Sequence, residues 1–314
     1  NSALGYDALT SNTTGTQNSA LGAYALGGST TGDSNVAVGY DCFSQANTGS
    51  SCTAVGAYAL KANTSGNYNT AVGRNALTQN TTAIGNTAVG YDSLATNTTG
   101  GQNQAFGYES LESNTTGSNN NGFGYKALNV NTTGAANVAV GNYALDANTT
   151  GSDNTAIGYG SLSVNTTAGS NTAVGRSALQ SNTTGTQNSA VATYALDANT
   201  TGSYSTASGY GSLTECTTGT QNTAFGNIAL DTLTTGSAVT AIGRRAGGGL
   251  TTGSQCTFLG YYAGVGNLGA TDNNQLYIAR NDAGAGAAAT WIKGNSSGSC
   301  FQGDNSSSWS TTSD

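Results

Sequence analysis

Apolar residues recur along almost the whole chain at one fixed spacing. Written in rows of 17, residues 1–272 form sixteen rows without an insertion or a deletion, and the consensus is N-T-A-V-G-Y-x-A-L-x-x-N-T-T-G-x-x. Position four is Val, Leu, Ile or Phe in every row except at Ser208, and position nine is Leu in thirteen rows. Such strict spacing predicts identical units that stack on their neighbours, because one indel would shift every later unit out of register.

Each unit is too short and too interrupted for a helix. Gly occupies position five in fifteen of the sixteen rows, with Ala192 as the exception, and an N-T-T-G block closes the row. Isolated helices confined between such breakers are marginal. The pattern instead predicts an all-β parallel β-solenoid, or β-roll, of sixteen 17-residue coils. Each coil would hold a short strand at N-T-A-V, a Gly corner, a second short strand at x-A-L-x and an N-T-T-G return turn, with Asn and Thr ladders between coils.

These assignments give each position of the coil an expected role. The predicted corner residues are represented by Gly5, Gly73, Gly90, Gly141, Gly175 and Gly226. The predicted core residues are represented by Val72, Leu77, Val89, Leu94, Val140, Leu145, Val174 and Leu179.

The apolar residues of each coil are adjacent in sequence, as Ala-Val and Ala-Leu. Neighbours on a strand point to opposite faces of a sheet, so both faces of each strand would be buried. One face can fill the interior of the coil, and the other then requires a partner surface along its whole length. This favours a homo-oligomer, and the alternative is that the small Ala side chain is simply exposed.

Composition removes several classes of function. Charged residues make up 7% of the chain, and there is no His, no Met and no Pro. The usual acid–base and metal-ligand inventory is therefore sparse, and we predict no catalytic residues, no metal and no cofactor. The net charge of −7 argues against a nucleic-acid partner. No apolar run is long enough for membrane insertion, and the start at Asn1 without a signal peptide suggests a fragment or a processed piece.

The five cysteines are too few and too irregularly spaced for a disulfide framework. They are Cys42, Cys52, Cys216, Cys256 and Cys300. We expect them to fill repeat positions as small side chains, with a Cys42–Cys52 bridge as the open alternative. The Asn-Thr-Thr tripeptides also match the N-glycosylation pattern, although repetition alone explains them. An ice-binding face built on these threonines is disfavoured because two adjacent residues of a strand cannot both point outward.

The N-T-A-V-G-x-x-A-L rows resemble the head repeats of YadA-like trimeric autotransporter adhesins. The resemblance covers residues 1–272 and implies left-handed parallel β-rolls packed as a homotrimer. The chain departs from that family in its longer, 17-residue period and in the added N-T-T-G turn. Handedness and trimer geometry are therefore expectations carried over from the resemblance.

The repeat ends at Asp272, and residues 273–314 form a different segment with "NNQLYIAR" and "WIKG". This segment resembles the stretch that precedes an S74-type intramolecular chaperone in bacteriophage tail fibres. That resemblance implies a small β cap or tip, followed by a cleavage point at Ser313 and Asp314 beyond which the chaperone is removed. Two domains are thus expected, a shaft over 1–272 and a cap over 273–314.

Candidate receptor contacts are aromatic and cationic residues near the C-terminal end. They are Tyr261, Tyr262, Arg244, Arg245, Arg280, Trp291 and Trp309. A Tyr column at positions six and seven could stack on sugar rings, although it could equally shield the corner from water. The arginines could bind anions or only take part in capping.

The combined interpretation is a non-enzymatic fibre protein. We expect a stiff homotrimeric shaft of a phage tail fibre, extracellular on the virion, joined to upstream virion attachment proteins and presenting a surface to a host-surface glycan or protein. The alternative is a cell-surface adhesin or extracellular filament subunit. A third interpretation is a glycan-degrading tailspike, for which the scattered carboxylates mark no catalytic pair.

Overall fold

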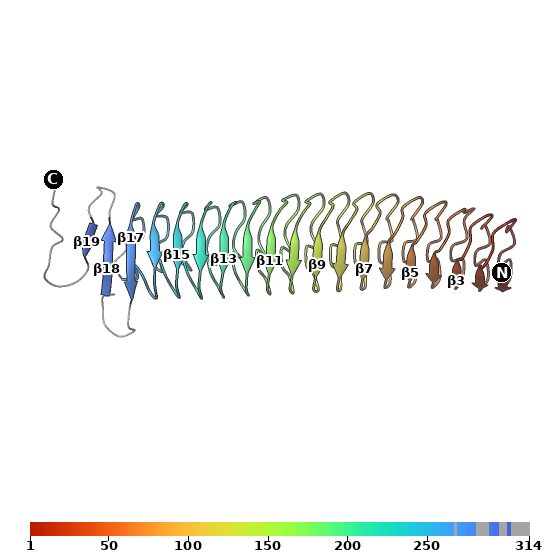
Figure 1. The fold of residues 1–314 in the computed structure, drawn as a ribbon, viewed down its shortest axis with the longest axis horizontal. Coiled ribbons are helices and arrows are strands. Elements are labelled where there is room, and N and C mark those ends of the chain that lie inside the picture. Colours follow the sequence, from red (N-terminus) through yellow and green to blue (C-terminus); the bar gives the residue numbers. More distant parts are fainter. Residues whose placement is uncertain (267–268, 281–288, 295–299, 303–314) are drawn as a thin grey trace. The chain divides into compact units, whose positions relative to one another are not determined.

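The computed structural model describes residues 1–266, 269–280, 289–294 and 300–302 (Figure 1). The chain divides into two compact units, Asn1–Thr167 and Ala168–Asp314. The described residues are all-β and contain no helix. The strands of the first unit are β1 (Ser2–Leu4), β2 (Ser19–Leu21), β3 (Val36–Val38), β4 (Thr53–Val55), β5 (Thr70–Val72), β6 (Thr87–Val89), β7 (Gln104–Phe106), β8 (Asn121–Phe123), β9 (Val138–Val140) and β10 (Thr155–Ile157). Those of the second unit are β11 (Thr172–Val174), β12 (Ser189–Val191), β13 (Thr206–Ser208), β14 (Thr223–Phe225), β15 (Thr240–Ile242), β16 (Thr257–Leu259), β17 (Leu276–Arg280), β18 (Ala289–Gly294) and β19 (Cys300–Gln302).

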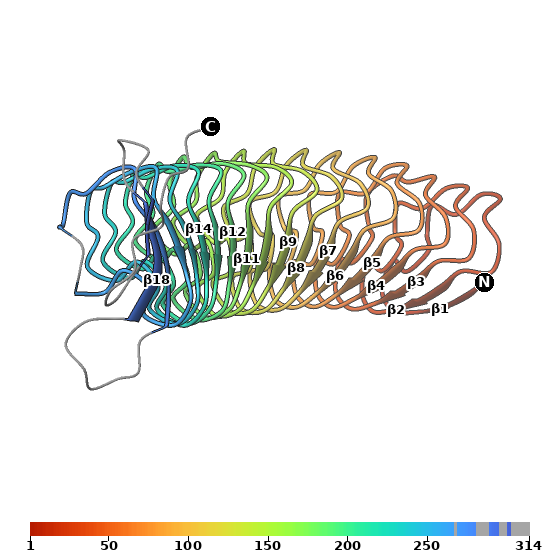
Figure 2. The same ribbon diagram turned by 60° about the vertical axis from the view of Figure 1, so that its left-hand side comes forward.

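Within each unit the strands follow one another in sequence order as a parallel ladder. In the first unit, for example, Ala71 of β5 pairs with Ala88 of β6, so that equivalent residues of successive 17-residue coils lie over one another. The same register holds from β11 to β16, where Thr240 pairs with Thr257. Figure 2 shows the coils as stacked loops with the strands gathered along one side. The predicted parallel β-solenoid with 17-residue coils is confirmed.

The second unit continues past the last repeat with one further parallel strand. Thr257 of β16 pairs with Leu276 of β17, so that these paired positions are 19 residues apart in sequence rather than 17. Strand β18 then pairs antiparallel with β17, and β19 pairs antiparallel with β18. The parallel pairing therefore extends beyond Asp272.

The interior of each coil is filled by small and branched apolar side chains. Position three is Ala in most coils and is fully buried, as at Ala71 and Ala173, and so is the Leu at position nine. The predicted core leucines Leu77, Leu94, Leu145 and Leu179 are all fully buried. The valines predicted in the core lie elsewhere: Val72, Val89 and Val174 are half-buried, and Val140 is 38% exposed. Period-two alternation explains this result, because with Ala inside, its neighbour Val must face outward.

Two buried columns of asparagine hold successive coils together. Asn103, at position one, donates from its side-chain amide to the Gly117 carbonyl of its own coil (2.8 Å), and its Oδ1 atom accepts from the Asn120 backbone of the next (2.9 Å). Asn114, at position twelve, donates to the same carbonyl at 2.9 Å. Coils that carry these asparagines are thus closed on themselves and bonded to their neighbours by groups with no exposure to water.

The predicted second strand at x-A-L-x is wrong, because this segment forms three consecutive tight turns. In the coil of β5, the amides of Ala76, Thr78 and Asn80 donate to the carbonyls of Gly73, Asn75 and Leu77 respectively. Positions seven and nine have positive φ, for example +58° at Asn75 and +51° at Leu77. A residue with positive φ as the third residue of a turn is typical of type II turns, and it breaks the extended conformation that a strand requires.

Gly is required at position five by both conformation and space. All six of the predicted corner glycines have φ between +132° and +150°. A Cβ atom at Gly73 would collide with the carbonyl oxygen of Gly90 in the next coil. Only a residue without a side chain satisfies both conditions without strain.

Burial also settles two questions about side-chain chemistry. Cys42, Cys52, Cys216 and Cys256 are free and buried, so the Cys42–Cys52 bridge is absent. Asn12 in the first coil is half-buried, whereas later sequon asparagines at position twelve, such as Asn97 and Asn114, are fully buried, and their amides bond inside the coil. These amides are therefore inaccessible for glycosylation in the folded chain.

Candidate binding surface

Tyrosines at positions six and seven form a column on the outer face of most coils. In the first unit, the rings of Tyr91, Tyr108 and Tyr125 stack nearly parallel at successive centroid distances of 5.3 Å. Elsewhere the rings meet edge to face, as for Tyr24 with Tyr6 (5.5 Å) and with Tyr40 (6.0 Å). The roughly 4.8 Å spacing of stacked coils brings successive rings into this contact range.

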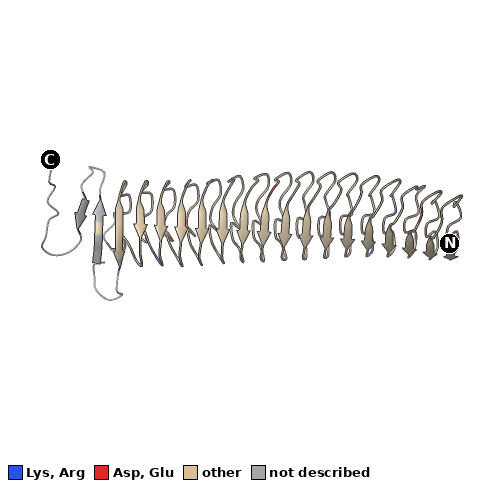
Figure 3. Ribbon diagram, viewed as in Figure 1, with Lys and Arg blue, Asp and Glu red and all other residues tan. Residues whose placement is uncertain are grey.

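Every basic side chain that the structure describes lies against this tyrosine column. Charged residues are sparse on the ribbon (Figure 3), yet the six described cations each lie within 6 Å of a Tyr ring centroid. These pairs are Lys61 with Tyr58, Arg74 with Tyr91, Lys126 with Tyr125, Arg176 with Tyr194, Arg244 with Tyr261 and Tyr262, and Arg245 with Tyr262. Cation–π attraction therefore recurs along the surface. Sequence reasoning missed this arrangement, although the basic residues fall at positions six, seven and ten, beside the tyrosines.

Carboxylates adjust the electrostatics of the column at two places. Lys61 forms a 2.7 Å ion pair with Asp41, and Lys126 forms one of 3.1 Å with Glu109. The pKa of Tyr108 rises to about 12, chiefly because its hydroxyl is hydrogen-bonded to Glu109. The same bond, followed by the contact with Lys126, lowers the pKa of Glu109. At neutral pH Tyr108 is therefore a neutral phenol beside the ion pair of Glu109 with Lys126.

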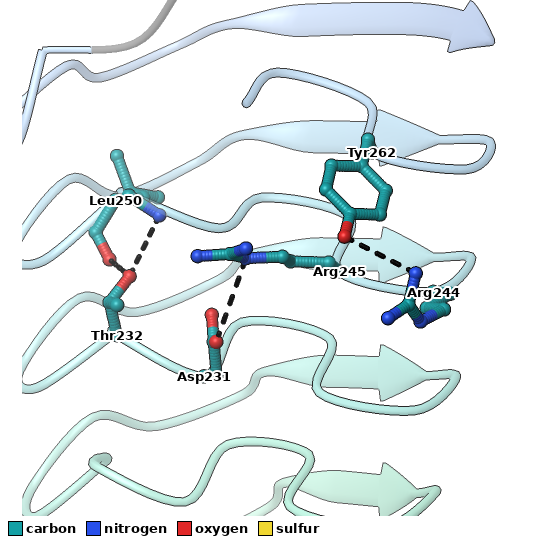
Figure 4. Close-up of polar contacts among 7 residues, drawn as sticks. Asp231, Thr232, Arg244, Arg245, Leu250 and Tyr262 are labelled. Atoms are coloured by element: carbon teal, nitrogen blue, oxygen red, sulfur yellow. Dashed lines mark hydrogen bonds and ion pairs between the residues drawn. The ribbon is translucent and has the colours of Figure 1, made fainter. Parts of the chain in front are cut away.

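The structure brings four of the predicted receptor-contact residues together in the second unit. Arg244 Nη1 donates to the hydroxyls of Tyr261 and Tyr262, at 3.0 and 3.2 Å, and the two rings lie 4.6 Å apart. Figure 4 shows Arg245 extended the other way, towards Asp231 and Thr232 of the preceding coil. Its Nε atom lies 3.9 Å from Asp231 Oδ2.

The internal partners of Arg244 and Arg245 determine which of their donor groups remain available to a ligand. Desolvation raises the pKa of the Asp231 carboxyl, and Arg245 opposes that shift. Arg245 is therefore held by an internal partner, whereas Arg244 is exposed and uses only one of its guanidinium nitrogens on the tyrosines. The cluster can contact an anionic or polar ligand through the remaining donors of Arg244.

The remaining predicted positions are only partly described. Arg280 lies in β17 and Trp291 in β18, but their side chains are outside the described part of the structure. Trp309, Ser313 and Asp314 lie outside the described residues, and so does the predicted maturation point.

The strand face that points away from the coil interior is apolar at position four. In the first unit Leu21, Val140 and Ile157 are 49%, 38% and 39% exposed, and Phe106 and Phe123 stack at 4.9 Å. In the second unit Val191 and Phe225 are 42% and 57% exposed. One such side chain follows another in successive coils, which makes an apolar column that is continuous in the first unit and interrupted only at Ser208 among the repeats of the second.

Comparison of the chain with protein-family models, curated proteins and solved structures found no match. Within the described residues, no group of three or more His, Cys, Asp or Glu side chains is placed to hold a metal ion. The described part likewise has no helix of the length and apolarity that a membrane span requires.

Proposed function

We propose that this chain is the homotrimeric shaft of a bacteriophage tail fibre, with a host-recognition surface. The observation that carries the proposal is the apolar column at position four, which a single chain leaves partly exposed in both units. A monomer gains nothing from exposing Val, Ile, Leu or Phe at coil after coil. Burial of the column against two further copies removes it from water, and the resemblance of the repeats to trimeric adhesin heads favours three chains.

The hydrogen-bonded coils suit a mechanical role. Most coils are closed by an Asn amide, and coils are bonded to the next by backbone, Asn and Thr groups, as in the contact of Thr98 Oγ1 with the Thr115 carbonyl (3.1 Å). Such one-dimensional stacks gain length by adding coils without changing the fold. A stiff, extended support that holds a recognition surface away from the particle uses this property directly.

Adhesion would be carried by the tyrosine column and its cations. Exposed aromatic faces beside hydrogen-bonding side chains are typical of surfaces that bind sugars. The Arg244, Tyr261 and Tyr262 cluster adds a cationic contact for a host-surface glycan or protein. In this proposal residues 273–314 cap the last coil, and their resemblance to the segment before an S74-type chaperone favours a place on the virion.

The coding region beyond Asp314 tests the virion assignment against a cell-surface adhesin. We expect an S74-type chaperone domain there, and C-terminal mass spectrometry of the mature protein should show that the chain ends at Asp314. A membrane-anchoring β-barrel in the same place would contradict the tail-fibre assignment and favour the adhesin.

A further inference from the structure

A pair of adjacent glycines opens a groove on the outer surface of the first unit. Gly27 and Gly28 occupy positions ten and eleven of their coil, and the neighbouring coils carry Thr10, Ser44 and Gln45 at these positions. The missing side chain of Gly27 leaves a groove of about 420 Å³, whereas Gly28 packs closely against the backbone of Ser44, Gln45 and Ala46 in the next coil. Its size is within the roughly 300–1,000 Å³ typical of small-ligand sites.

The second unit contains a similar glycine pair that is filled in part from within. The side chain of Arg245 from position seven takes up the space at Gly248, where a Cβ would be 2.9 Å from Arg245 Cγ, while a Cβ at Gly249 would meet no atom within 4 Å. In the first unit position seven is Tyr24, whose ring is held between Tyr6 and Tyr40. A Cβ at Gly27 would meet only the backbone of Asp7 and Tyr24 at 3.2 Å. Among the described residues, none of the three atoms nearest to a Cβ at Gly27 belongs to a side chain.

The groove combines an aromatic face with several fixed polar groups. Tyr24 lines it and is 38% exposed, and Asp7, Asp41, Gln45 and Lys61 surround the ring. Lys61 holds the Asp41 carboxylate at 2.7 Å and also lies 5.1 Å from the Tyr58 ring centroid, so both charges are positioned before any ligand arrives. Partial desolvation, followed by the neighbouring Tyr6 and Asp7, raises the pKa of Tyr24, which keeps its hydroxyl protonated as a donor.

We infer that this groove binds an uncharged saccharide of one or two sugar units. The apolar face of a pyranose ring packs on Tyr24, and its hydroxyls donate to the Asp7 and Asp41 carboxylates and accept from Lys61 and Gln45. Two carboxylates against one ammonium disfavour acidic sugars and phosphates. The groove uses coil positions seven, ten and eleven, whereas the apolar column uses position four. The inference rests on the proposed function only for the source of the ligand, a host-surface polysaccharide.

Binding of defined saccharides to the intact mature protein tests this site. We expect neutral gluco-, galacto- or manno-oligosaccharides to bind in calorimetric titrations, and their uronic-acid counterparts to bind at least tenfold more weakly. The Tyr24→Ala and Gly27→Thr variants should each weaken neutral-sugar binding at least tenfold, whereas Tyr24→Phe should retain most of it. Asn227→Ala is the control and should leave neutral-sugar binding unchanged, because Asn227 is exposed at position six of a coil without a tyrosine and lies outside the groove.

Two results would overturn the inference. One is the absence of binding by all the neutral sugars, and the other is unchanged affinity in both the Tyr24→Ala and Gly27→Thr variants when their circular dichroism matches the parent. Neither result depends on assembly. If the protein is a trimer and both variants still bind sugar, saccharide binding in the groove is contradicted and the fibre proposal is kept. If the protein is a monomer and both variants lose sugar binding, the fibre proposal is contradicted and the groove is kept.

Discussion

Asn114 donates a hydrogen bond from its side-chain amide to Oδ1 of Asn97, its equivalent 17 residues earlier, at 2.8 Å. Its own Oδ1 accepts an equivalent hydrogen bond from the side-chain amide of Asn131, also at 2.8 Å. The column therefore links three successive coils through buried amides. The chain itself shows what an interruption does: Cys216 takes the place of Asn in the next coil after Asn199, and Asn199 Oδ1 is buried without a hydrogen bond.

Replacement of Asn114 by Ala should destabilise the coils around it. The change leaves Asn97 Oδ1 and Asn131 Nδ2 without these partners, and each buried unsatisfied group costs about 1–3 kcal/mol. We expect a loss of about 2–4 kcal/mol in the free energy of opening, measured by amide hydrogen exchange in residues 97–131. The control Thr116→Ala, at an exposed position of the same coil, should change exchange little. Equal hydrogen exchange in both variants would contradict a stabilising role for the asparagine column at position twelve.

Replacement of Ala192 by Gly should stabilise the protein. Ala192 is the one exception to Gly at position five and has a φ of +118°, which a residue with a Cβ rarely adopts. Relief of this strain should add roughly 1 kcal/mol of stability, seen as a higher denaturation midpoint. The reverse change, Gly107→Ala, brings a Cβ into the carbonyl of Gly124 and should destabilise the first unit. A lower midpoint for Ala192→Gly would contradict the corner assignment.

The buried thiols should be unreactive in the folded protein. Burial raises the pKa of Cys42 and Cys52 to about 11, from 9.0 when exposed. In a Cys300→Ser variant, a disulfide reagent at pH 8 should label these thiols slowly before unfolding and rapidly after it. Because the folded pKa is raised, their contribution to stability is complete below about pH 9 and is lost as the pH rises towards 11. Rapid labelling of the folded protein would show that the coil interior is open.

Two aspartate substitutions should separate the coil interior from the chain interface. Leu145→Asp puts an unpaired charge into a fully buried site and should unfold nearby coils, at a cost above about 3 kcal/mol. Val140→Asp alters a side chain that is 38% exposed in the single chain, so circular dichroism should change little while the assembly weakens. A Val140→Asp protein that assembles as the parent does would mean that position four is not an interface.

The sequence predicts the coil length and the parallel stacking because both follow from a period without indels. It also predicts the buried leucines and the corner glycines, since these positions admit few residue types. It does not predict the turns at positions seven to twelve, because Leu in a left-handed conformation opposes the usual preference of that residue. Backbone hydrogen bonds to adjacent coils, such as Leu77 N to the Ser93 carbonyl at 3.0 Å, override that preference.

The candidate site could be predicted less completely than the fold. Adjacent Ala and Val indicate two faces, but they do not show which of the two faces is inside, and Ala37 and Ala139 are buried where the larger valines are not. The cluster of Arg244 with Tyr261 follows from their 17-residue separation. The groove beside Gly27 depends on the rotamers of Tyr24 and Lys61 in neighbouring coils, which a row-by-row pattern does not contain.

The mass of the mature protein in native solution tests the central claim most directly. The protein should be produced from its complete coding region, so that any assembly domain acts before it is removed, and then measured by native mass spectrometry. We expect three copies of the 31.0 kDa chain. A stable monomer would contradict the proposal that partner chains bury the apolar column at position four, and with it the fibre shaft.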